Sequence, residues 1–118
     1  MNIVVCAKQV PDTETVPKVF RVDQSGLGWE TPGAAPVLSI YDELAAEMGL
    51  KVKDANPESV VRVITLGQNL AIDVVKKPLA MGADELYLLQ DDNLEGGDAF
   101  ATAYALEAAI RKLGPFDL

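Results

Sequence analysis

The residues that most often do chemistry in proteins are scarce in this chain. The sequence has no histidine and one cysteine, Cys6. Ser-His-Asp and Cys-His arrangements, histidine-based zinc sites, internal disulfides and multi-cysteine metal sites are therefore excluded. We expect a protein that binds a ligand and does not catalyse a reaction with its own side chains.

Backbone N–H groups at one strand end and three predicted helix starts are the candidate ligand contacts. The strand ends at residues 6–8, and the helices start at residues 39–42, 67–70 and 97–102. Helix starts bind anions through free N–H groups and the helix dipole. The candidate residues are Cys6, Ala7, Lys8, Ser39, Ile40, Tyr41, Asp42, Leu66, Gly67, Asp98 and Thr102. The alternative is that these are ordinary caps and turns.

Single residues in this set also have two interpretations. Lys8 either pairs with a phosphate group or is a solvated lysine after the strand. Cys6 lies in an apolar strand, which predicts a buried small residue and not a nucleophile. Asp91, Asp92 and Glu95 could bind a cation, but we expect a solvated acidic loop. Neither G-x-G-x-x-G nor G-x-x-x-x-G-K-[ST] is present, so these two phosphate-binding fingerprints do not apply.

Three apolar runs, residues 2–6, 60–64 and 86–89, must position these groups. Continuous apolar runs are typical of parallel strands buried on both faces. Right-handed crossovers then give the sheet order 3-2-1-4, with a fourth strand beginning at Phe116. Ligands of such sheets bind beyond the carboxyl ends of the strands, so the site is expected beside the first strand.

Three helices complete the predicted pattern, with N-caps at Ser39, Asn69 and Asp98. The first should end near Gly49 or one turn later, and the third should span residues 99–113. Their apolar positions are Ile40, Leu44 and Met48 in the first, Ile72, Val75 and Leu79 in the second, and Ala103, Leu106, Ile110 and Leu113 in the third.

The predicted second helix contains a proline, Pro78, which is expected to break it. Pro78 removes a hydrogen bond and clashes with the carbonyl of Val74, at a cost of about 3 kcal/mol in a helix interior. A kink or a broken last turn is therefore predicted. Gly82 follows the predicted helix end and is expected to adopt a positive φ there.

Residues 9–36 hold four of the seven prolines and three of the nine glycines. This density predicts no helix and no long strand. Residues 19–22 and 27–30 are expected to form a small hairpin outside the main sheet. A structureless surface loop is the alternative. Trp29 either contacts a partner or, as we favour, packs back on the domain.

Whole-chain properties narrow the class of protein. The 118 residues fit one domain, residues 1–118, with 49% hydrophobic and 24% charged residues. A net charge of −8 argues against non-specific nucleic-acid binding. We see neither a signal-peptide pattern nor an apolar run of the roughly 18 residues needed to span a membrane, and so expect a cytoplasmic protein. The strand begun at Phe116 suggests the first part of a longer protein.

Several segments resemble the beta subunit of electron transfer flavoproteins. They are residues 1–14 (MNIVVCAKQVPDTE), 41–43 (YDE), 79–84 (LAMGAD) and, in the last helix opening, Gly97-Asp98 with residues 101–103. The first and the LAMGAD segment are specific in combination. The resemblance covers the whole chain and about the first half of a family subunit. It implies an adenine-nucleotide-binding, Rossmann-like α/β fold, an open and mostly parallel three-layer sheet, here with a hairpin insertion.

The resemblance also implies a function. Family beta subunits bind AMP or, in electron-bifurcating members, a second FAD, which implies contacts at Cys6 and its neighbours, at residues 39–42 and at Leu66. Such a subunit pairs with an alpha subunit that carries the main FAD. The pair passes electrons between dehydrogenases and ferredoxin-linked or quinone-linked partners, as an electron carrier and not an enzyme. The family usually has Asn-Pro at Ser39-Ile40.

Two further expectations follow. The family's next nucleotide-binding loop and its dehydrogenase-recognition segment lie beyond Leu118, so residues 1–118 alone should bind AMP or FAD weakly or not at all. The alternative function is a stand-alone nucleotide-binding protein of the stress type, acting as a homodimer. Isolation as a yellow heterodimer supports the first function and isolation as a colourless homodimer the second.

Overall fold

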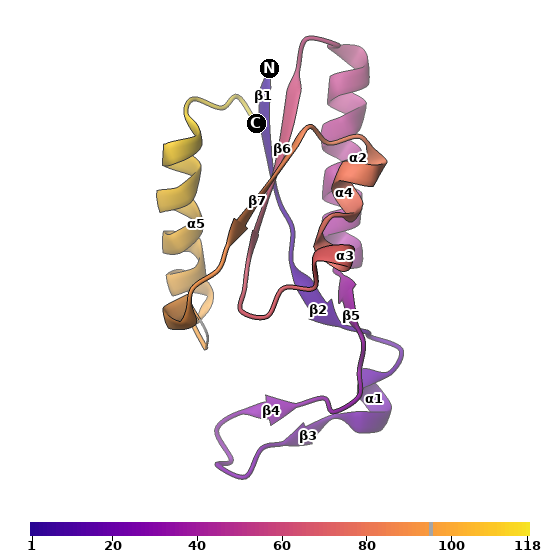
Figure 1. Ribbon diagram of the computed structural model, residues 1–118, viewed down its shortest axis with the longest axis vertical. Coiled ribbons are helices and arrows are strands. Elements are labelled where there is room, and N and C mark those ends of the chain that lie inside the picture. Colours follow the sequence, from indigo (N-terminus) through magenta and orange to yellow (C-terminus); the bar gives the residue numbers. More distant parts are fainter. Residues whose placement is uncertain (95) are drawn as a thin grey trace.

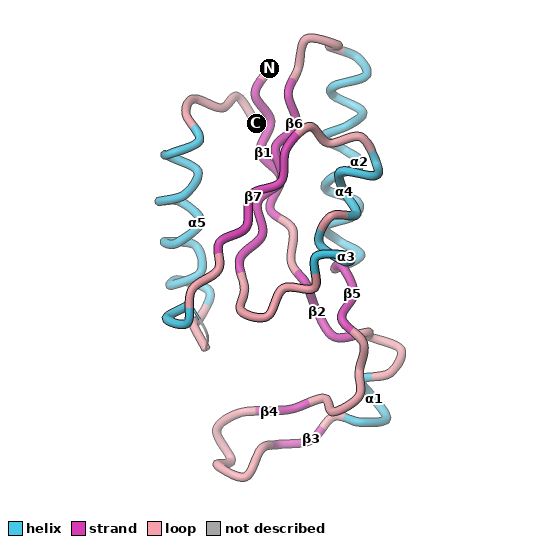
Figure 2. Tube along the Cα trace, in the orientation of Figure 1, coloured by secondary structure: helices cyan, strands magenta, loops and turns pink. Residues whose placement is uncertain are grey.

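The computed structural model describes residues 1–94 and 96–118 and shows an α/β protein with three small sheets (Figures 1 and 2). In chain order the elements are β1 (Asn2–Cys6), β2 (Gln9–Pro11), α1 (Val16–Val19), β3 (Arg21–Val22), β4 (Trp29–Glu30), β5 (Pro36–Leu38), α2 (Ile40–Ala55), β6 (Val60–Leu66), α3 (Ile72–Val75), α4 (Lys77–Met81), β7 (Glu85–Leu89), the 3-10 turn η1 (Asp92–Leu94) and α5 (Ala99–Leu113).

The main sheet is parallel, in the order β1-β6-β7. This is the order predicted for the first three strands, and it is consistent with a Rossmann-like layout. The central strand β6 is paired on both edges, and its Val61, Val63, Ile64 and Thr65 are buried. A strand covered on both faces and paired on both edges can be this apolar because most of it is shielded from water.

Helices cover both faces of this sheet, as predicted, but unequally (Figure 1). One face packs against α2, with α4 and α3 beside it, and carries the core. The core residues are Ile3, Val5, Ala7, Leu38, Ala46, Val61, Val63 and Ala83. On the other side lies α5, which has no buried residue. The domain therefore has one dense layer and one loosely covered layer.

Polar groups on the sheet explain part of this asymmetry. Arg62 Nε donates to Glu85 Oε2 at 2.8 Å, and Arg62 Nη1 donates to Asn2 Oδ1 at 3.1 Å. Tyr87 Oη donates to the same Glu85 oxygen at 2.7 Å. These four residues lie on all three strands, and their charges are only partly buried. Such a network holds the strands in register without forming an apolar core.

The outer edge of β1 already has hydrogen-bonded neighbours. Asp117 N donates to Asn2 O and Val4 N donates to Leu118 O, each at 2.8 Å. The two residues lie beside β1 on the side away from β6, where the predicted fourth strand would start. The structure assigns no strand to them.

The first helix differs from its prediction in three ways. It runs to Ala55, six residues beyond Gly49. The Ser39 side chain makes no cap hydrogen bond. The apolar positions Ile40, Leu44 and Met48 are exposed, at 60% or more, whereas Ala46 and Gly49 are buried. A Cβ added at Gly49 would lie 3.2 Å from Val5 Cγ2, so the helix packs through its small residues because only they allow this close approach.

The predicted second helix is two short helices. The break at Lys76 confirms the effect expected of Pro78, which stands in the first turn of α4, where a proline has no hydrogen bond to lose. Asn69 is not the N-cap. It has φ 45°, and α3 begins at Ile72 after Ala71.

Burial in these helices and in α5 follows the prediction only in part. Val75 is buried as expected, whereas Ile72 and Leu79 are exposed. The last helix spans the predicted residues, and Asp98 Oδ1 accepts from Ala101 N at 2.8 Å as its N-cap. Of its predicted apolar stripe, Leu106, Ile110 and Leu113 are half-buried but Ala103 is exposed.

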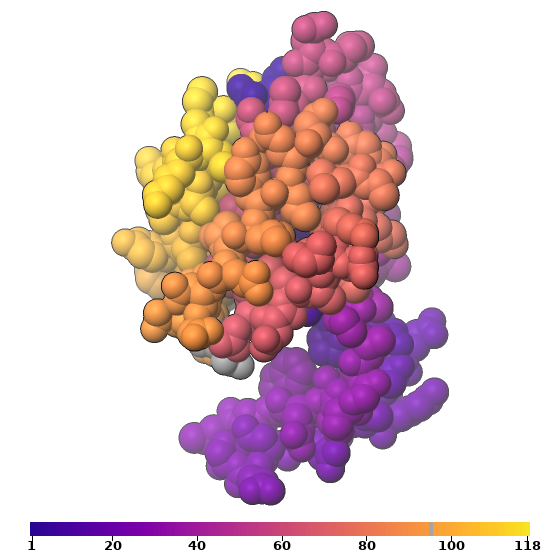
Figure 3. Space-filling model, viewed as in Figure 1, coloured from indigo at the N-terminus to yellow at the C-terminus, as the bar shows by residue number. Residues whose placement is uncertain are grey.

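The proline-rich insertion is more regular than predicted. The hairpin is present as β3 and β4, but the insertion also contains the helix α1 and the antiparallel pair β2–β5 at its base. Pro17 is tolerated because it lies in the first turn of α1. The hairpin projects from the rest of the domain (Figure 3). Trp29 stacks on Phe20 at 6.1 Å and remains 60% exposed, so it does not pack back on the core.

Gly82 has φ 124°, so we expect its replacement to be costly. The nearest atom to an added Cβ is Leu50 Cδ2 at 3.5 Å, an ordinary contact, so the cost is conformational. Gly82→Val should lower the free energy of unfolding by about 1–3 kcal/mol in denaturant titrations, because a β-branched residue resists this φ. Ala80→Val, at an exposed position of α4, is the control and should cost about 0.5 kcal/mol. An unchanged stability of Gly82→Val would contradict the assignment.

Asp84, the last residue of LAMGAD, joins three elements. Its carboxylate accepts from Lys53 Nζ at 2.6 Å and from Val61 N at 2.7 Å, and its own N–H donates to Val61 O at 2.9 Å. The Lys53 and Val61 hydrogen bonds hold the pKa of this carboxyl below its usual range. The charged form of Asp84 is therefore stabilised by folding.

Asp84→Asn should consequently reduce stability by about 1 kcal/mol at pH 7, a modest value because 36% of the side chain is exposed and water screens it. Because the folded pKa is lowered, the wild-type advantage is complete above the unfolded pKa of about 3.9 and disappears as the pH falls through the folded value. Urea titrations between pH 7 and pH 2 would measure it. Asp54→Asn, on the exposed side of α2, is the matched control. Parallel stability curves for Asp84→Asn and wild type across this range would refute the role.

Candidate functional site

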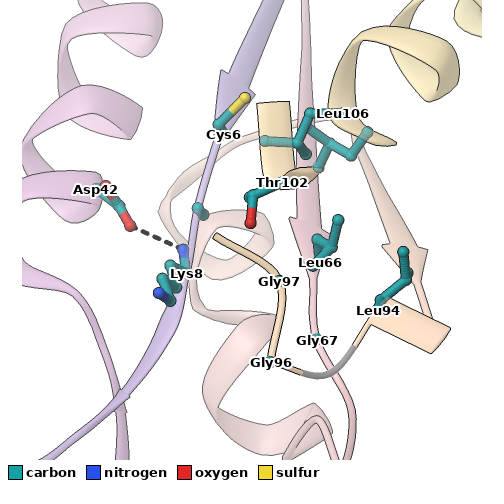
Figure 4. Close-up of a pocket in the computed structure, with 12 residues that line it drawn as sticks. Cys6, Lys8, Asp42, Leu66, Gly67, Leu94, Gly96, Gly97, Thr102 and Leu106 are labelled. Carbon is teal, nitrogen blue, oxygen red and sulfur yellow. Dashed lines mark hydrogen bonds between the residues drawn. The ribbon is translucent and has the colours of Figure 1, made fainter. Parts of the chain in front are cut away.

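A pocket lies at the carboxyl ends of β1 and β6, closed on a third side by the start of α5 (Figure 4). Its volume is about 390 Å³. The lining residues are Cys6, Ala7, Lys8, Asp42, Ile64, Leu66, Gly67, Leu94, Gly96, Gly97, Thr102 and Leu106. This is the sheet edge at which the sequence predicts the site.

The structure brings together seven of the eleven predicted contacts. They are Cys6, Ala7, Lys8, Asp42, Leu66, Gly67 and Thr102. Ser39, Ile40, Tyr41 and Asp98 do not line the pocket. Ile40 and Tyr41 point to solvent, because the face of α2 that meets the sheet is the opposite one. Asp98 is occupied as the cap of its own helix.

The sequence prediction missed part of the apolar wall. Ile64 and Leu106 line the pocket from β6 and α5, and Leu94 and Gly96 line it from the loop after β7. Gly96 has φ 70°, a conformation that favours glycine, so the Gly96-Gly97 pair was the available signal for this loop. The apolar residues carried no such signal because any strand or helix has them.

Strand β1 is fastened to the start of α2 at the pocket edge. Asp42 Oδ2 accepts from Lys8 N at 2.8 Å (Figure 4), and Ser39 N donates to Lys8 O at 2.9 Å. The Lys8 backbone N–H is thus already bonded, and only its ammonium group remains for an anionic ligand. The Asp42 carboxylate, near the positive end of the helix dipole, gives the same wall a hydrogen-bond acceptor.

Cys6 is exposed at this edge, which corrects the expectation of a buried residue. Strand alternation directs Val5 and Ala7 into the core and Cys6 to the opposite, loosely covered face. The protein atoms around the thiol raise its pKa, and the Asp42 carboxylate raises it further. Cys6 is therefore a protonated, weakly nucleophilic thiol at neutral pH.

The glycine loop and the start of α5 form the third wall. A Cβ added at Gly97 would lie 3.4 Å from Ala101 Cβ and 4.0 Å from Thr102 Oγ1, so the loop follows the first turn of α5 closely. The Thr102 hydroxyl faces the pocket (Figure 4). Backbone groups, one hydroxyl, one ammonium group and one carboxylate thus surround an otherwise apolar cavity.

The acidic loop next to this wall is hydrogen-bonded within the protein. Asp91 Oδ1 accepts from Asn93 N and Nδ2, and Asp92 Oδ1 accepts from Gln68 Nε2 at 3.0 Å. Glu95 lies outside the described residues. Within residues 1–94 and 96–118 no group of three or more histidine, cysteine, aspartate or glutamate side chains is placed to hold a metal ion.

A parallel α/β sheet with its pocket beyond the carboxyl strand ends defines the class of α/β proteins that bind ligands at this edge. Sequence comparison identifies the family within this class. The profile described as "Electron transfer flavoprotein domain" matches residues 32–118, and the chain belongs to the electron transfer flavoprotein family.

Curated relatives agree with this assignment. The chain is 42% identical over 113 residues to the electron transfer flavoprotein subunit beta of Megasphaera elsdenii, covering 96% of this chain and 40% of that protein. It is 42% identical over its full length to the caffeyl-CoA reductase-Etf complex subunit CarD of Acetobacterium woodii, covering 44% of that protein. Identity to the protein FixA of Azorhizobium caulinodans is 39% over 114 residues, 97% of this chain and 39% of FixA. The resemblance to beta subunits is confirmed, and the chain spans about two fifths of the length of these relatives.

No helix among the described residues has the length and hydropathy that crossing a membrane requires.

The raised pKa of Cys6 yields a test of the pocket's electrostatics. Iodoacetamide labelling of Cys6 should show a midpoint above the usual thiol value of about 8.5. Asp42→Asn should lower this midpoint, because a neutral amide no longer repels the thiolate, while its oxygen still accepts from Lys8 N. Glu43→Gln is the control, since Glu43 is paired with Lys77 at 2.6 Å. Equal midpoints in wild type and Asp42→Asn would show that the two groups do not interact.

Proposed function

We propose that residues 1–118 are the N-terminal, nucleotide-binding domain of an electron transfer flavoprotein beta subunit, with AMP or a second FAD bound in the pocket. The observation that carries the proposal is the position of this pocket in a chain of that family. The cavity of about 390 Å³ lies within the range of about 300–1,000 Å³ usual for ligand sites.

The groups on the pocket walls fit an adenine nucleotide. Lys8 supplies a cation for a phosphate group, and the Gly96-Gly97 backbone permits close approach of the ligand. Asp42 and Thr102 offer hydrogen-bond partners to a sugar, and Ile64 and Leu106 an apolar surface to a base. In this proposal the contacts are the seven predicted residues that line the pocket, together with Ile64, Leu106 and the Gly96-Gly97 backbone.

The subunit would act as an electron carrier and not as an enzyme by itself. It would pair with an alpha subunit that carries the main FAD, in a cytoplasmic heterodimer, and pass electrons between dehydrogenases and a quinone-linked or ferredoxin-linked acceptor. A bound AMP would be structural, whereas a second FAD would supply redox chemistry. The names of the relatives, all beta subunits or FixA and CarD proteins, favour this function over a homodimeric stress-type protein.

Binding can be tested by two-dimensional NMR titration of the ¹⁵N-labelled chain, which detects weak complexes. AMP or FAD should shift the amide signals of residues 6–8, 66–67 and 97–102 and leave those of the β3–β4 hairpin unchanged. Lys8→Met should weaken the binding about fivefold, the value of one exposed charge contact of about 1 kcal/mol. Lys18→Met, in the distant helix α1, should not.

Co-expression with an electron transfer flavoprotein alpha subunit tests the partner. A yellow heterodimer is expected. Shifts of amide signals at the opposite edge of the sheet would refute the proposed function. A colourless homodimer that does not bind the alpha subunit would also refute it.

A further inference from the structure

The side chain of Gln9 connects two parts of the chain that are 60 residues apart. Its Oε1 accepts from Ala71 N at 2.7 Å, and its Nε2 donates to Asn69 O at 3.3 Å. One amide thus makes a hydrogen bond of each kind to the backbone of the loop that follows β6. We name residues 67–71 the β6 loop.

The first two residues of the β6 loop are held by other contacts, since Gly67 N donates to Leu89 O at 3.1 Å and Gln68 Nε2 donates to Asp92 Oδ1 at 3.0 Å, whereas Gln9 holds its second half. Asn69 has φ 45°, an uncommon conformation outside glycine, and Ala71 stands at the start of α3 without a side chain that could cap it. Gly67, at the other end of the loop, lines the pocket. A Cβ at Gly67 would lie 2.9 Å from Leu70 Cδ2, so the side chain of Leu70, in the part of the loop that Gln9 holds, packs closely against the pocket wall at Gly67.

Gln9 is held firmly enough to act as a support. It is paired with Leu38 in the β2–β5 ladder. The preceding residue, Lys8, is bonded through its N–H to Asp42 and through its carbonyl to Ser39 N. A series of hydrogen bonds therefore connects the start of α2, the segment after β1 and the β6 loop. These hydrogen bonds lie along the pocket.

We propose that Gln9 is a positioning residue for the pocket, because its amide holds the β6 loop, and with it Gly67, in the conformation that receives the nucleotide. This inference rests on the proposed function. The role requires a side chain of this length with both a donor and an acceptor. Methionine has the length and neither group, whereas a glutamate carboxylate keeps only the acceptor.

The experiment compares Gln9→Met and Gln9→Glu with wild type, and Gln24→Met with its exposed hairpin-tip position is the matched control. Two quantities are measured by NMR on the same samples, the hydrogen-exchange rate of the Ala71 amide and the dissociation constant of AMP. In Gln9→Met the Ala71 amide should exchange at least tenfold faster and AMP should bind at least fivefold more weakly. Gln9→Glu, which folds with an isosteric side chain, should lie between, and Gln24→Met should match wild type.

Each outcome is decisive. Unchanged exchange at Ala71 in both Gln9 variants would overturn the inference, and so would faster exchange with an unchanged AMP dissociation constant, which would make Gln9 a structural residue only. Loss of AMP binding without a change in Ala71 exchange would also overturn it. If neither residues 1–118 nor a chain extended through the next loop binds AMP or FAD, the proposed function fails, and Gln9 then has no nucleotide to position, although exchange at Ala71 still shows whether it holds the loop.

Discussion

The parallel pairing of β6 with both of its neighbours is the constraint on which the rest of the structure depends. A central parallel strand must be buried on both faces, so helices have to cover the sheet on each side. Parallel pairing also directs the carboxyl ends of β1 and β6 to the same edge, with register Cys6 opposite Ile64 and Leu66 opposite Leu89. The pocket lies at that edge because the chain leaves the sheet at each carboxyl strand end, and the loops that follow β1 and β6 separate there.

Close packing against this sheet is achieved with small residues. Gly49 and Ala46 bring α2 against β1, so the larger apolar residues of the helix, among them Leu44 and Met48, face outward. The Asp84 carboxylate then ties the start of β7 to β6 and to α2. A charged carboxylate can join these elements because a backbone N–H and a lysine ammonium group both donate hydrogen bonds to it.

Hydrogen bonds from the residues that follow β1 fix the pocket walls more than the helix starts do. Asp42 holds the backbone of Lys8, and Gln9 holds the β6 loop. The first turn of α5 meets the cavity through Thr102 and that of α2 through Asp42, while α3 is short and begins five residues after Gly67. Such a site depends on few directional groups, which are the Lys8 ammonium, the Asp42 carboxylate and the Thr102 hydroxyl.

Outside residues 9–36, local signals in the sequence determined the main strands and helices. Apolar runs predicted the three parallel strands and their order, Asp98 predicted the start of α5, and the fixed φ of Pro78 and the freedom of Gly82 predicted a break and a turn, because these effects act within a few residues. The same strand ends located the pocket, and specific segments identified the family.

Only the tertiary structure decided which surfaces are buried. The apolar stripe that the sequence of α2 predicts is larger than the face that packs. The face with Gly49 is buried because its contact with Val5 allows the helix to approach the sheet more closely. Cys6 is exposed because one face of β1 is thinly covered, and Asn69 has a positive φ in a loop that Gln9 holds from 60 residues away. Burial and long-range hydrogen bonds depend on partners distant in the chain, and no local pattern specifies them.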